Sequence, residues 1–242
     1  EGEHREQQSS DRPARHVTPS MTGWLAAGHV HGSSCVQHWP KLGNDPILRA
    51  VSNQDRSRLT VLVPCFDAGA HLTPLLESLL GQTESNLRIV VVDDRSTDDS
   101  VAVARAHLGV EVVVNDQRLG IGGNWNRCAS LVDSEYFALA HMDDVYEPAW
   151  ASKSLERLRA QPAAGAVHSR ARAIDEGGQF FDSPRERYKL RAWRHARHGD
   201  RAATYRRLLQ GNFVAAPSVV WRTTAFRGIG GFDASLRFAL DW

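Results

Sequence analysis

The stretch LTVLVPCFDAGAHLTPLLESLLGQTESNLRIVVVDDRSTDDS, residues 59–100, decides the fold. It opens with an apolar, β-branched run at 59–63 that Pro64 ends, which is typical of a buried strand. Leucines then recur at positions 72, 75, 76, 79 and 80, the spacing of an amphipathic helix. A second apolar run at 87–92 predicts another buried strand. The order strand, helix, strand is the repeating unit of a parallel α/β sheet.

The same alternation continues along the chain. The patterns predict helices over residues 98–107, 124–132 and 150–160, and strands over 110–114, 136–140, 164–168 and 217–221. The expected fold class is therefore α/β, with a Rossmann-like, mostly parallel sheet flanked by helices.

Composition narrows the class of protein. With 242 residues, 42% hydrophobic and 24% charged, the chain suits a globular domain and excludes a collagen, a coiled coil or a disulfide-stapled miniprotein. A net charge of +1 gives no general attraction to nucleic acid, and no apolar window reaches the length of a membrane span. Three cysteines without metal-type spacing favour a reduced compartment, so we expect a cytoplasmic protein.

Two regions differ in character. Residues 1–57 are polar, or carry scattered Trp, His and Gly without periodicity, and we expect a poorly ordered leader or appendage. Residues 58–242 carry the α/β pattern and are expected to form the functional domain.

Acidic residues follow three of the predicted strands. Asp67 follows the first, Asp93 and Asp94 end the second, and Asp143 and Asp144 follow the fourth. Ligands of open parallel sheets bind at the carboxyl ends of the strands, so these acids are expected to converge. Carboxylate oxygens suit Mg²⁺ or Mn²⁺, which commonly take one or two carboxylates plus substrate phosphates. Each acid alone is equally well explained as a turn residue, a helix cap or a solvated charge.

Other motifs are weaker. Gly120-Ile121-Gly122-Gly123 lacks the GxGxxG spacing and follows the third strand, so a Rossmann nicotinamide site is rejected. Asn124 and Asn126 would serve either as helix caps or as diphosphate contacts. His141 would either approach the site or pack in a loop.

Taken together, these motifs resemble those of glycosyltransferase family 2. The first strand, with Pro64-Cys65-Phe66-Asp67, resembles the family's opening strand, which usually ends Pro-x-Tyr-Asn. Residues 89–100 (IVVVDDRSTDDS) are similar to its Val-Val-Asp-Asp-Gly-Ser-Thr-Asp-x-Ser, and residues 143–148 (DDVYEP) to its metal-site motif. Residues 217–221, 230–233 and 236–242 resemble its acceptor-side motifs.

The resemblance implies a GT-A fold and an inverting transfer of a sugar from a nucleotide-diphosphate donor to a glycan or lipid-linked acceptor. It implies a nucleotide-binding half over 58–148 and an acceptor-side half over 149–242, incomplete at the C-terminus.

The resemblance also implies roles for individual residues. Pro64, Phe66, Asp67, Asp93, Asp94, Asn126 and Asp143 would contact the donor. Asp144, with Asp143, would hold a divalent cation, Mn²⁺ or Mg²⁺. Asp241 would be the general base that deprotonates the acceptor hydroxyl.

Several departures leave alternatives open. His141 replaces the first Asp of the family's Asp-x-Asp, and Leu240 replaces the Glu before the base, so an inactive nucleotide-sugar-binding relative or a non-functional fragment is the rival hypothesis. A response-regulator-like domain is a third, disfavoured because no lysine follows a late strand. The arginine-rich residues 185–207 would either contact an anionic, lipid-linked acceptor at the inner face of the membrane or form a solvated surface.

Overall fold

The computed structural model describes residues 58–175, 178–180, 184–196 and 201–236, and the backbone of two strands, β1 (Arg15–Thr18) and β2 (Met21–Ala26). The other strands are β3 (Leu59–Cys65), β4 (Leu87–Asp93), β5 (Val110–Val114), β6 (Tyr136–Leu139), β7 (Val145–Tyr146), β8 (Ala164–Ser169), β9 (Arg172–Ile174) and β10 (Val219–Arg222). The α-helices are α1 (Leu72–Leu80), α2 (Ser100–Ala106), α3 (Gly120–Ser130), α4 (Trp150–Ala160), α5 (Pro184–Ala196), α6 (Arg201–Gln210) and α7 (Thr223–Gly228). Two 3₁₀-helices, η2 (Gly69–His71) and η3 (Ala216–Ser218), precede α1 and β10.

The main sheet has seven strands in the order β2-β8-β10-β6-β3-β4-β5. The strands β6, β3, β4 and β5 are mutually parallel, whereas β10 is antiparallel to both β6 and β8, and β2 is antiparallel to β8. Five strands therefore run one way and two the other, which confirms the predicted mostly parallel sheet. A smaller sheet has the order β7-β1-β9.

Strands β1 and β2 lie in the region for which the sequence predicted no strand. Each pairs with strands of the α/β domain, β2 with β8, and β1 with β7 and β9. The missed signal has a physical reason: β2 lies at the edge of its sheet, where strand periodicity is under weaker constraint.

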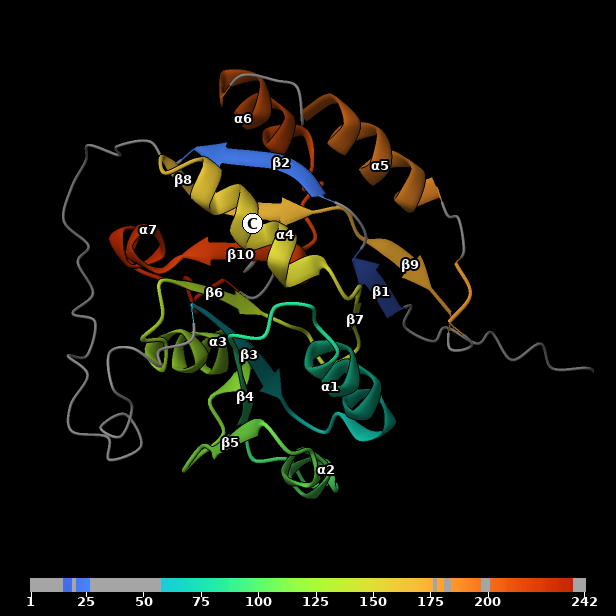
Figure 1. Cartoon of the computed structure of the whole chain (residues 1–242), viewed down its shortest axis with the longest axis vertical. Coiled ribbons are helices and arrows are strands. Elements are labelled where there is room, and N and C mark those ends of the chain that lie inside the picture. Colours follow the sequence, from blue (N-terminus) through green and yellow to red (C-terminus); the bar gives the residue numbers. More distant parts are fainter. Residues whose placement is uncertain are drawn as a thin grey trace, which may run out of the picture.

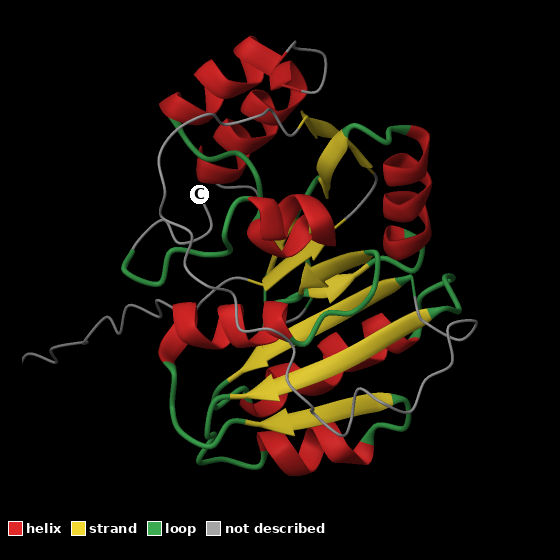
Figure 2. Ribbon diagram, turned by 90° about the vertical axis from the view of Figure 1, so that its left-hand side faces the viewer, coloured by secondary structure: helices red, strands yellow, loops and turns green. Residues whose placement is uncertain are grey.

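Helices cover both faces of the sheet, as Figures 1 and 2 show. Alternate residues of β3 point to opposite faces, because side chains in a strand alternate with a period of two. Val61 and Val63 pack with residues of α1, α2 and α4, whereas Leu62 packs with residues of α3 and α7. The result is a three-layer α/β/α arrangement.

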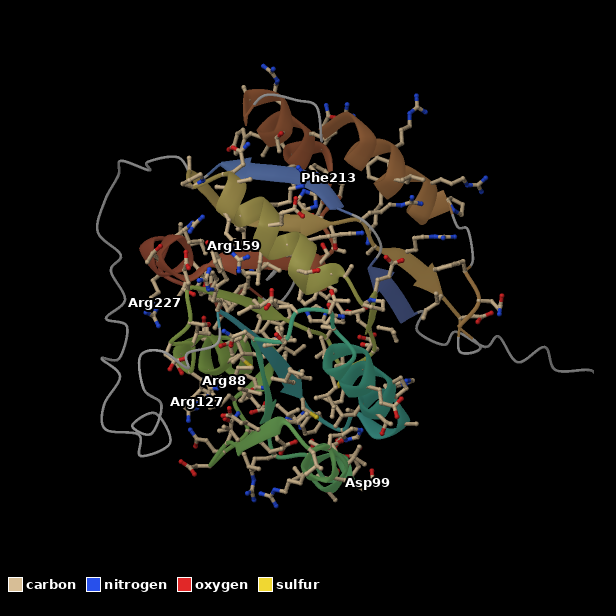
Figure 3. The ribbon with its side chains drawn as sticks, in the orientation of Figure 1. Arg88, Asp99, Arg127, Arg159, Phe213 and Arg227 are labelled. Atoms are coloured by element: carbon tan, nitrogen blue, oxygen red, sulfur yellow. The ribbon has the colours of Figure 1, made fainter. Side chains whose placement is uncertain are left out.

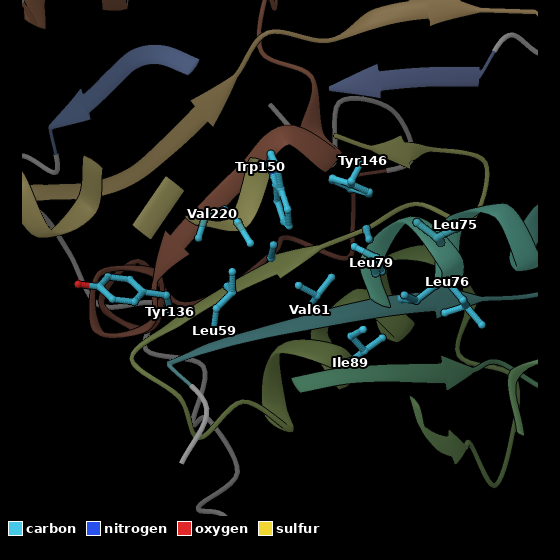
Figure 4. Close-up of a cluster of buried hydrophobic side chains, with 14 of the residues drawn as sticks. Leu59, Val61, Leu75, Leu76, Leu79, Ile89, Tyr136, Tyr146, Trp150 and Val220 are labelled. Atoms are coloured by element: carbon cyan, nitrogen blue, oxygen red, sulfur yellow. The ribbon is translucent and has the colours of Figure 1, made fainter. Parts of the chain in front are cut away.

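The larger core cluster forms between the sheet and helices α1 and α4 (Figure 4). Leu75, Leu76 and Leu79 of α1 are buried against Val61 and Ile89 of the sheet. This is the leucine stripe that predicted an amphipathic helix. Its burial fixes α1 beside β3 and so orients the loop that follows β3.

Several predicted boundaries shift in the structure, and one region that the patterns left open takes a defined form. Helix α3 begins at Gly120, four residues before the predicted start at 124, and β10 begins at Val219 after the short η3. The arginine-rich region, for which no helix bounds were predicted, contains two helices, α5 and α6. Among the residues the structure describes, no helix is both long enough and apolar enough to span a bilayer.

Candidate active site

A cavity of about 290 Å³ opens at the carboxyl ends of β3 and β4 and beside the segment that follows β6. Its walls come from the end of β3, the turn after β4, the start of α3 and the segment after β6. The lining residues are Pro64, Cys65, Phe66, Asp94, Arg118, Gly120, Ile121, Asn124, Trp125, His141, Met142 and Asp143. Of the predicted site residues, the structure thus brings Pro64, Phe66, Asp94 and Asp143 to one cavity.

Asp94 is 3% exposed and is the acid that organises this cavity. Its Oδ1 accepts hydrogen bonds from Asn115 Nδ2 (2.9 Å) and the Leu119 amide (2.7 Å), and its Oδ2 accepts one from the Gly120 amide (2.8 Å). A carboxylate from a distant strand therefore caps the first turn of α3, where its negative charge also meets the positive end of the helix dipole. This explains why α3 begins at Gly120, and it leaves those two amides unavailable for a phosphate.

Asp93 and Asp67 shape the loops next to the cavity and do not line it. Asp93 folds back on its own turn, accepting from the amides of Arg95 and Ser96 at 3.1 Å each and from the Ser96 hydroxyl. Asp67 Oδ1 accepts from the Thr97 amide at 2.7 Å, and the Asp67 amide donates to Ser96 Oγ at 3.0 Å. These bonds tie the loop after β3 to the loop after β4, as expected for acids at turns.

Aromatic and cationic side chains form the rest of the wall. The Arg118 guanidinium lies 3.7 Å from the centre of the Phe66 ring, a cation–π contact. The Trp125 indole stacks on the His141 imidazole with ring centres 5.1 Å apart. Sequence reasoning missed Arg118 and Trp125, because a lone arginine in a loop and a helical tryptophan carry no motif.

The Asp143–Asp144 pair lies in the segment between β6 and β7. Asp143 lines the cavity and is half-buried, while Asp144 is 1% exposed. Burial, together with the Asp144 charge, raises the pKa of the neighbouring Tyr146 well above its usual value. That hydroxyl therefore stays protonated and donates to the Pro217 carbonyl at 2.9 Å.

The coordination of the predicted divalent cation would have to be completed by oxygen atoms of the bound donor. Within the described ranges, no three His, Cys, Asp or Glu side chains are grouped so that they could hold a metal ion. A pair of neighbouring carboxylates, one on the cavity wall, still fits Mg²⁺ or Mn²⁺, because these ions accept one or two carboxylates plus phosphate oxygens.

Gln82, which sequence reasoning also missed, anchors the far end of this segment. Its Nε2 donates to the carbonyls of Ser78 (3.0 Å) and Glu147 (2.9 Å), and its Oε1 accepts from the Ala151 amide (2.9 Å). The side chain thus fastens the end of α1 to the start of α4, and so fixes the loop that begins with Asp143.

The remaining candidate residues, Asn126, Asn124 and Asp241, differ in where they lie. Asn126 is not on the cavity: its Nδ2 donates to the Phe232 carbonyl (2.9 Å), and its Oδ1 accepts from the Phe232 amide (3.1 Å). Asn124 does line the cavity, with Nδ2 donating to the Val92 carbonyl at 3.0 Å. Asp241, the predicted base, lies outside the residues that the structure describes.

Burial raises the pKa of the Cys65 thiol to about 11, so this cavity-lining cysteine is not a ready nucleophile.

A parallel α/β sheet with acids and a cavity at its strand ends is the architecture of a nucleotide-binding domain. The family model for glycosyl transferase family 2 matches residues 60–223, more than half of the chain. The chain belongs to glycosyl transferase family 2, and its fold is the GT-A type.

Similar proteins agree with this assignment. An uncharacterized glycosyltransferase of Haemophilus influenzae is 25% identical over 186 residues, covering 76% of this chain and 59% of that relative. Chondroitin synthase of Escherichia coli is 24% identical over 128 residues, covering 52% of this chain and 19% of the synthase. This chain therefore spans only part of the length of these relatives.

Solved structures share the fold. Residues 1–349 of S. aureus TarS, solved in complex with UDP, align with a TM-score of 0.56 at 19% identity, covering 76% of this chain and 52% of that one. The mannosyltransferase PcManGT of Pyrobaculum calidifontis, solved with GDP-Man and Mn²⁺, aligns with a TM-score of 0.52 at 20% identity, covering 74% and 48%.

Proposed function

We propose that this chain is the donor-binding and catalytic part of an inverting glycosyltransferase, which transfers a sugar from a nucleotide diphosphate to a hydroxyl of a glycan or lipid-linked acceptor. The observation that carries the proposal is the cavity at the carboxyl ends of β3 and β4, in a chain that belongs to glycosyl transferase family 2. The cavity brings together the aromatic ring of Phe66, the positively charged side chain of Arg118 and the carboxylate of Asp143.

The nucleotide would lie along the β3 and β4 end of the cavity. Phe66 and Pro64 offer an apolar surface for the base, and Asp94 would shape this wall by capping α3, since its carboxylate is already hydrogen-bonded. Asp67 and Asp93 would act by holding the two loops in shape, because their carboxylates are already engaged in turn hydrogen bonds. The Asn126 amide would act in the same indirect way, through Phe232.

The diphosphate would lie toward Asp143 and Asp144, which would hold Mn²⁺ or Mg²⁺. Such a cation neutralises the negative charge of a departing diphosphate. PcManGT, solved with GDP-Man and Mn²⁺, offers a precedent in the same fold. Arg118 would add a fixed positive charge at the same cavity, since its guanidinium is already held on Phe66.

The general base is proposed to be Asp241. A carboxylate on the acceptor side would accept the proton of the attacking hydroxyl while the diphosphate leaves from the opposite face, which gives inversion. The acceptor itself is proposed as a class only, a glycan or a lipid-linked sugar.

A thermal-shift panel tests the donor site. UDP, GDP, UDP-GlcNAc and GDP-mannose are each added with Mn²⁺, Mg²⁺ or EDTA, since TarS and PcManGT were solved with ligands of these kinds. A ligand that binds only the folded state stabilises it by about 2.7 kcal/mol at a hundredfold excess over its Kd. We expect one nucleotide to raise the Tm with a cation and not with EDTA. No shift with any nucleotide would contradict the proposal.

The rival hypothesis is a nucleotide-sugar-binding relative without turnover. The observation that favours it is His141 on the cavity wall, at the position where the family motif has an Asp. Sugar transfer by the wild type, abolished by Asp241→Asn with donor binding retained, would exclude the rival. Donor binding without transfer by the wild type would establish it.

A further inference from the structure

Helices α5 and α6 concentrate positive charge at one end of the molecule. They carry eight of the 29 Lys and Arg residues but only one of the 28 Asp and Glu residues, Glu186. Their formal charge is thus +7, whereas that of the whole chain is +1. The remainder of the chain is therefore acidic overall, and the molecule has a strong charge asymmetry. The eight are Arg185, Arg187, Lys189, Arg191, Arg194, Arg201, Arg206 and Arg207.

Both helices lie beyond the β2 edge of the main sheet, at the opposite end from β5 (Figure 1). Figure 3 shows nitrogen-tipped side chains on both helices pointing away from the rest of the molecule. The side chains of Arg187, Arg191 and Arg206 are exposed. Like charges so gathered repel one another, which favours contact with an anionic partner.

Apolar side chains are exposed among these arginines. Tyr205 and Leu209 of α6 are 63% and 64% exposed and lie one helical turn apart, on one face. Tyr188 of α5 is also exposed at its ring, although its hydroxyl lies 3.4 Å from the Gln210 carbonyl. Exposed Tyr and Leu side chains on the same helices as exposed arginines are typical of a segment that lies in a membrane interface, because the apolar groups enter the boundary while the cations meet lipid phosphates.

Other side chains of the two helices pack against the protein. Ala192 of α5 is buried with Phe213, and Leu190 and Leu208 pack against them. Gly211, at the end of α6, leaves room for the Tyr188 ring, since a Cβ there would lie 2.6 Å from its hydroxyl. The basic face is therefore presented by a folded helical pair.

We infer that the exposed face of α5 and α6, formed by Arg187, Arg191, Tyr205, Arg206 and Leu209, docks the protein on an anionic lipid surface. This contact would hold the enzyme beside lipid-linked acceptors. The inference rests on the charge and exposure of the two helices and not on sugar transfer, so vesicle binding and nucleotide binding can fail independently.

Vesicle co-sedimentation tests the charge. The chain is mixed with phosphatidylcholine vesicles with or without phosphatidylserine, at low and high salt. We expect binding only to the anionic vesicles, and weaker binding at high salt. The variant Arg187→Gln/Arg191→Gln/Arg206→Gln should lower the partition coefficient by about 100-fold, at about 1 kcal/mol for each charge. A matched control, Arg105→Gln/Arg157→Gln/Arg159→Gln, removes three exposed arginines from α2 and α4 and should bind like the wild type.

A second pair of variants tests the apolar contribution and the identity of the partner. Tyr205→Ser/Leu209→Ser should weaken vesicle binding at least about tenfold. Leu108→Ser, at a 93% exposed position after α2, should not. No binding to anionic vesicles at low salt would overturn the inference. Equal loss in the arginine variant and its control would also overturn it. A third result would overturn it as well: tight binding to soluble polyphosphate, with the Tyr205→Ser/Leu209→Ser variant binding both polyphosphate and vesicles like the wild type. That pattern would mark a general polyanion-binding surface.

Discussion

Replacing Asp94 with Asn should destabilise the protein even without any ligand. The Asp94 carboxylate accepts three hydrogen bonds, one from a side-chain amide and two from the amides that begin α3. An Asn of the same shape retains one oxygen and turns an NH₂ group toward at least one of those donors. The substitution therefore removes an acceptor, a negative charge at a helix N-terminus, and the cap of a helix that packs on β3 and β4.

The magnitude follows from these losses. A hydrogen bond to a charged group contributes about 1.5–3 kcal/mol, and a negative charge at a helix N-terminus about 0.3–1 kcal/mol. We therefore expect the free energy of unfolding to fall by about 3 kcal/mol, a large part of the 5–15 kcal/mol that is usual for a domain.

Urea unfolding in the absence of nucleotide measures this loss. Asp67→Asn is the matched control, because the Asp67 carboxylate is exposed and, among the residues that the structure describes, accepts hydrogen bonds from Thr97 alone. It should cost no more than about 1 kcal/mol. If Asp94→Asn unfolded within 1 kcal/mol of the wild type, or no more easily than Asp67→Asn, Asp94 would not be the structural cap described here. An acid needed only for ligand binding would leave the unfolding free energy unchanged or raised.

Other predictions concern the supports of the site and the core. Gln82→Ala removes three hydrogen bonds, two of which join the end of α1 to the start of α4, so urea unfolding should show a loss of about 2 kcal/mol; an unchanged midpoint would refute the anchoring role. Asn126→Ala frees both backbone groups of Phe232 and should also cost about 2 kcal/mol in the same assay, whereas a pure ligand contact would cost nothing. Burial lowers the pKa of His168 from 6.5 to about 4, so between these values the unfolded chain binds a proton that folded His168 does not. The free energy of unfolding should therefore fall by up to about 3 kcal/mol as pH drops from 6.5 to 4, and His168→Gln should lack that part of the slope; an identical slope in both proteins would contradict it.

The sequence predicts the parallel half of the fold well, because each element there is buried on a regular period. The valine runs of β3 and β4 and four of the five leucines in the α1 stripe are core positions, whereas the fifth, Leu80, is 42% exposed. The prediction is weaker where partners far apart in sequence decide the structure. Helix α3 starts four residues early because Asp94, more than twenty residues upstream, caps it.

The site shows the same division. The acids at the strand ends correctly predicted where the cavity lies, and the predicted residues Phe66, Asp94 and Asp143 line it. It did not distinguish acids that line the cavity from acids that hold its loops, because Asp93 and Asp94 are adjacent and differ only in which way the turn directs them. Arg118 and Gln82 were missed for a related reason: each acts through contacts formed only in the folded chain, Arg118 with Phe66, and Gln82 with the Glu147 carbonyl and the Ala151 amide.

The central claim is that the cavity at the ends of β3 and β4 binds a nucleotide diphosphate with a cation at Asp143 and Asp144. Calorimetric titration of UDP and GDP in Mn²⁺ tests it most directly, on the wild type, on Asp143→Asn and on Asp99→Asn, an exposed acid at the N-terminus of α2 that does not line the cavity (labelled in Figure 3). We predict binding of one nucleotide by the wild type and the Asp99 variant, and affinity at least tenfold weaker, about 1.4 kcal/mol, in the Asp143 variant and in EDTA. Binding of neither nucleotide, or equal affinity in all three proteins, would contradict the account.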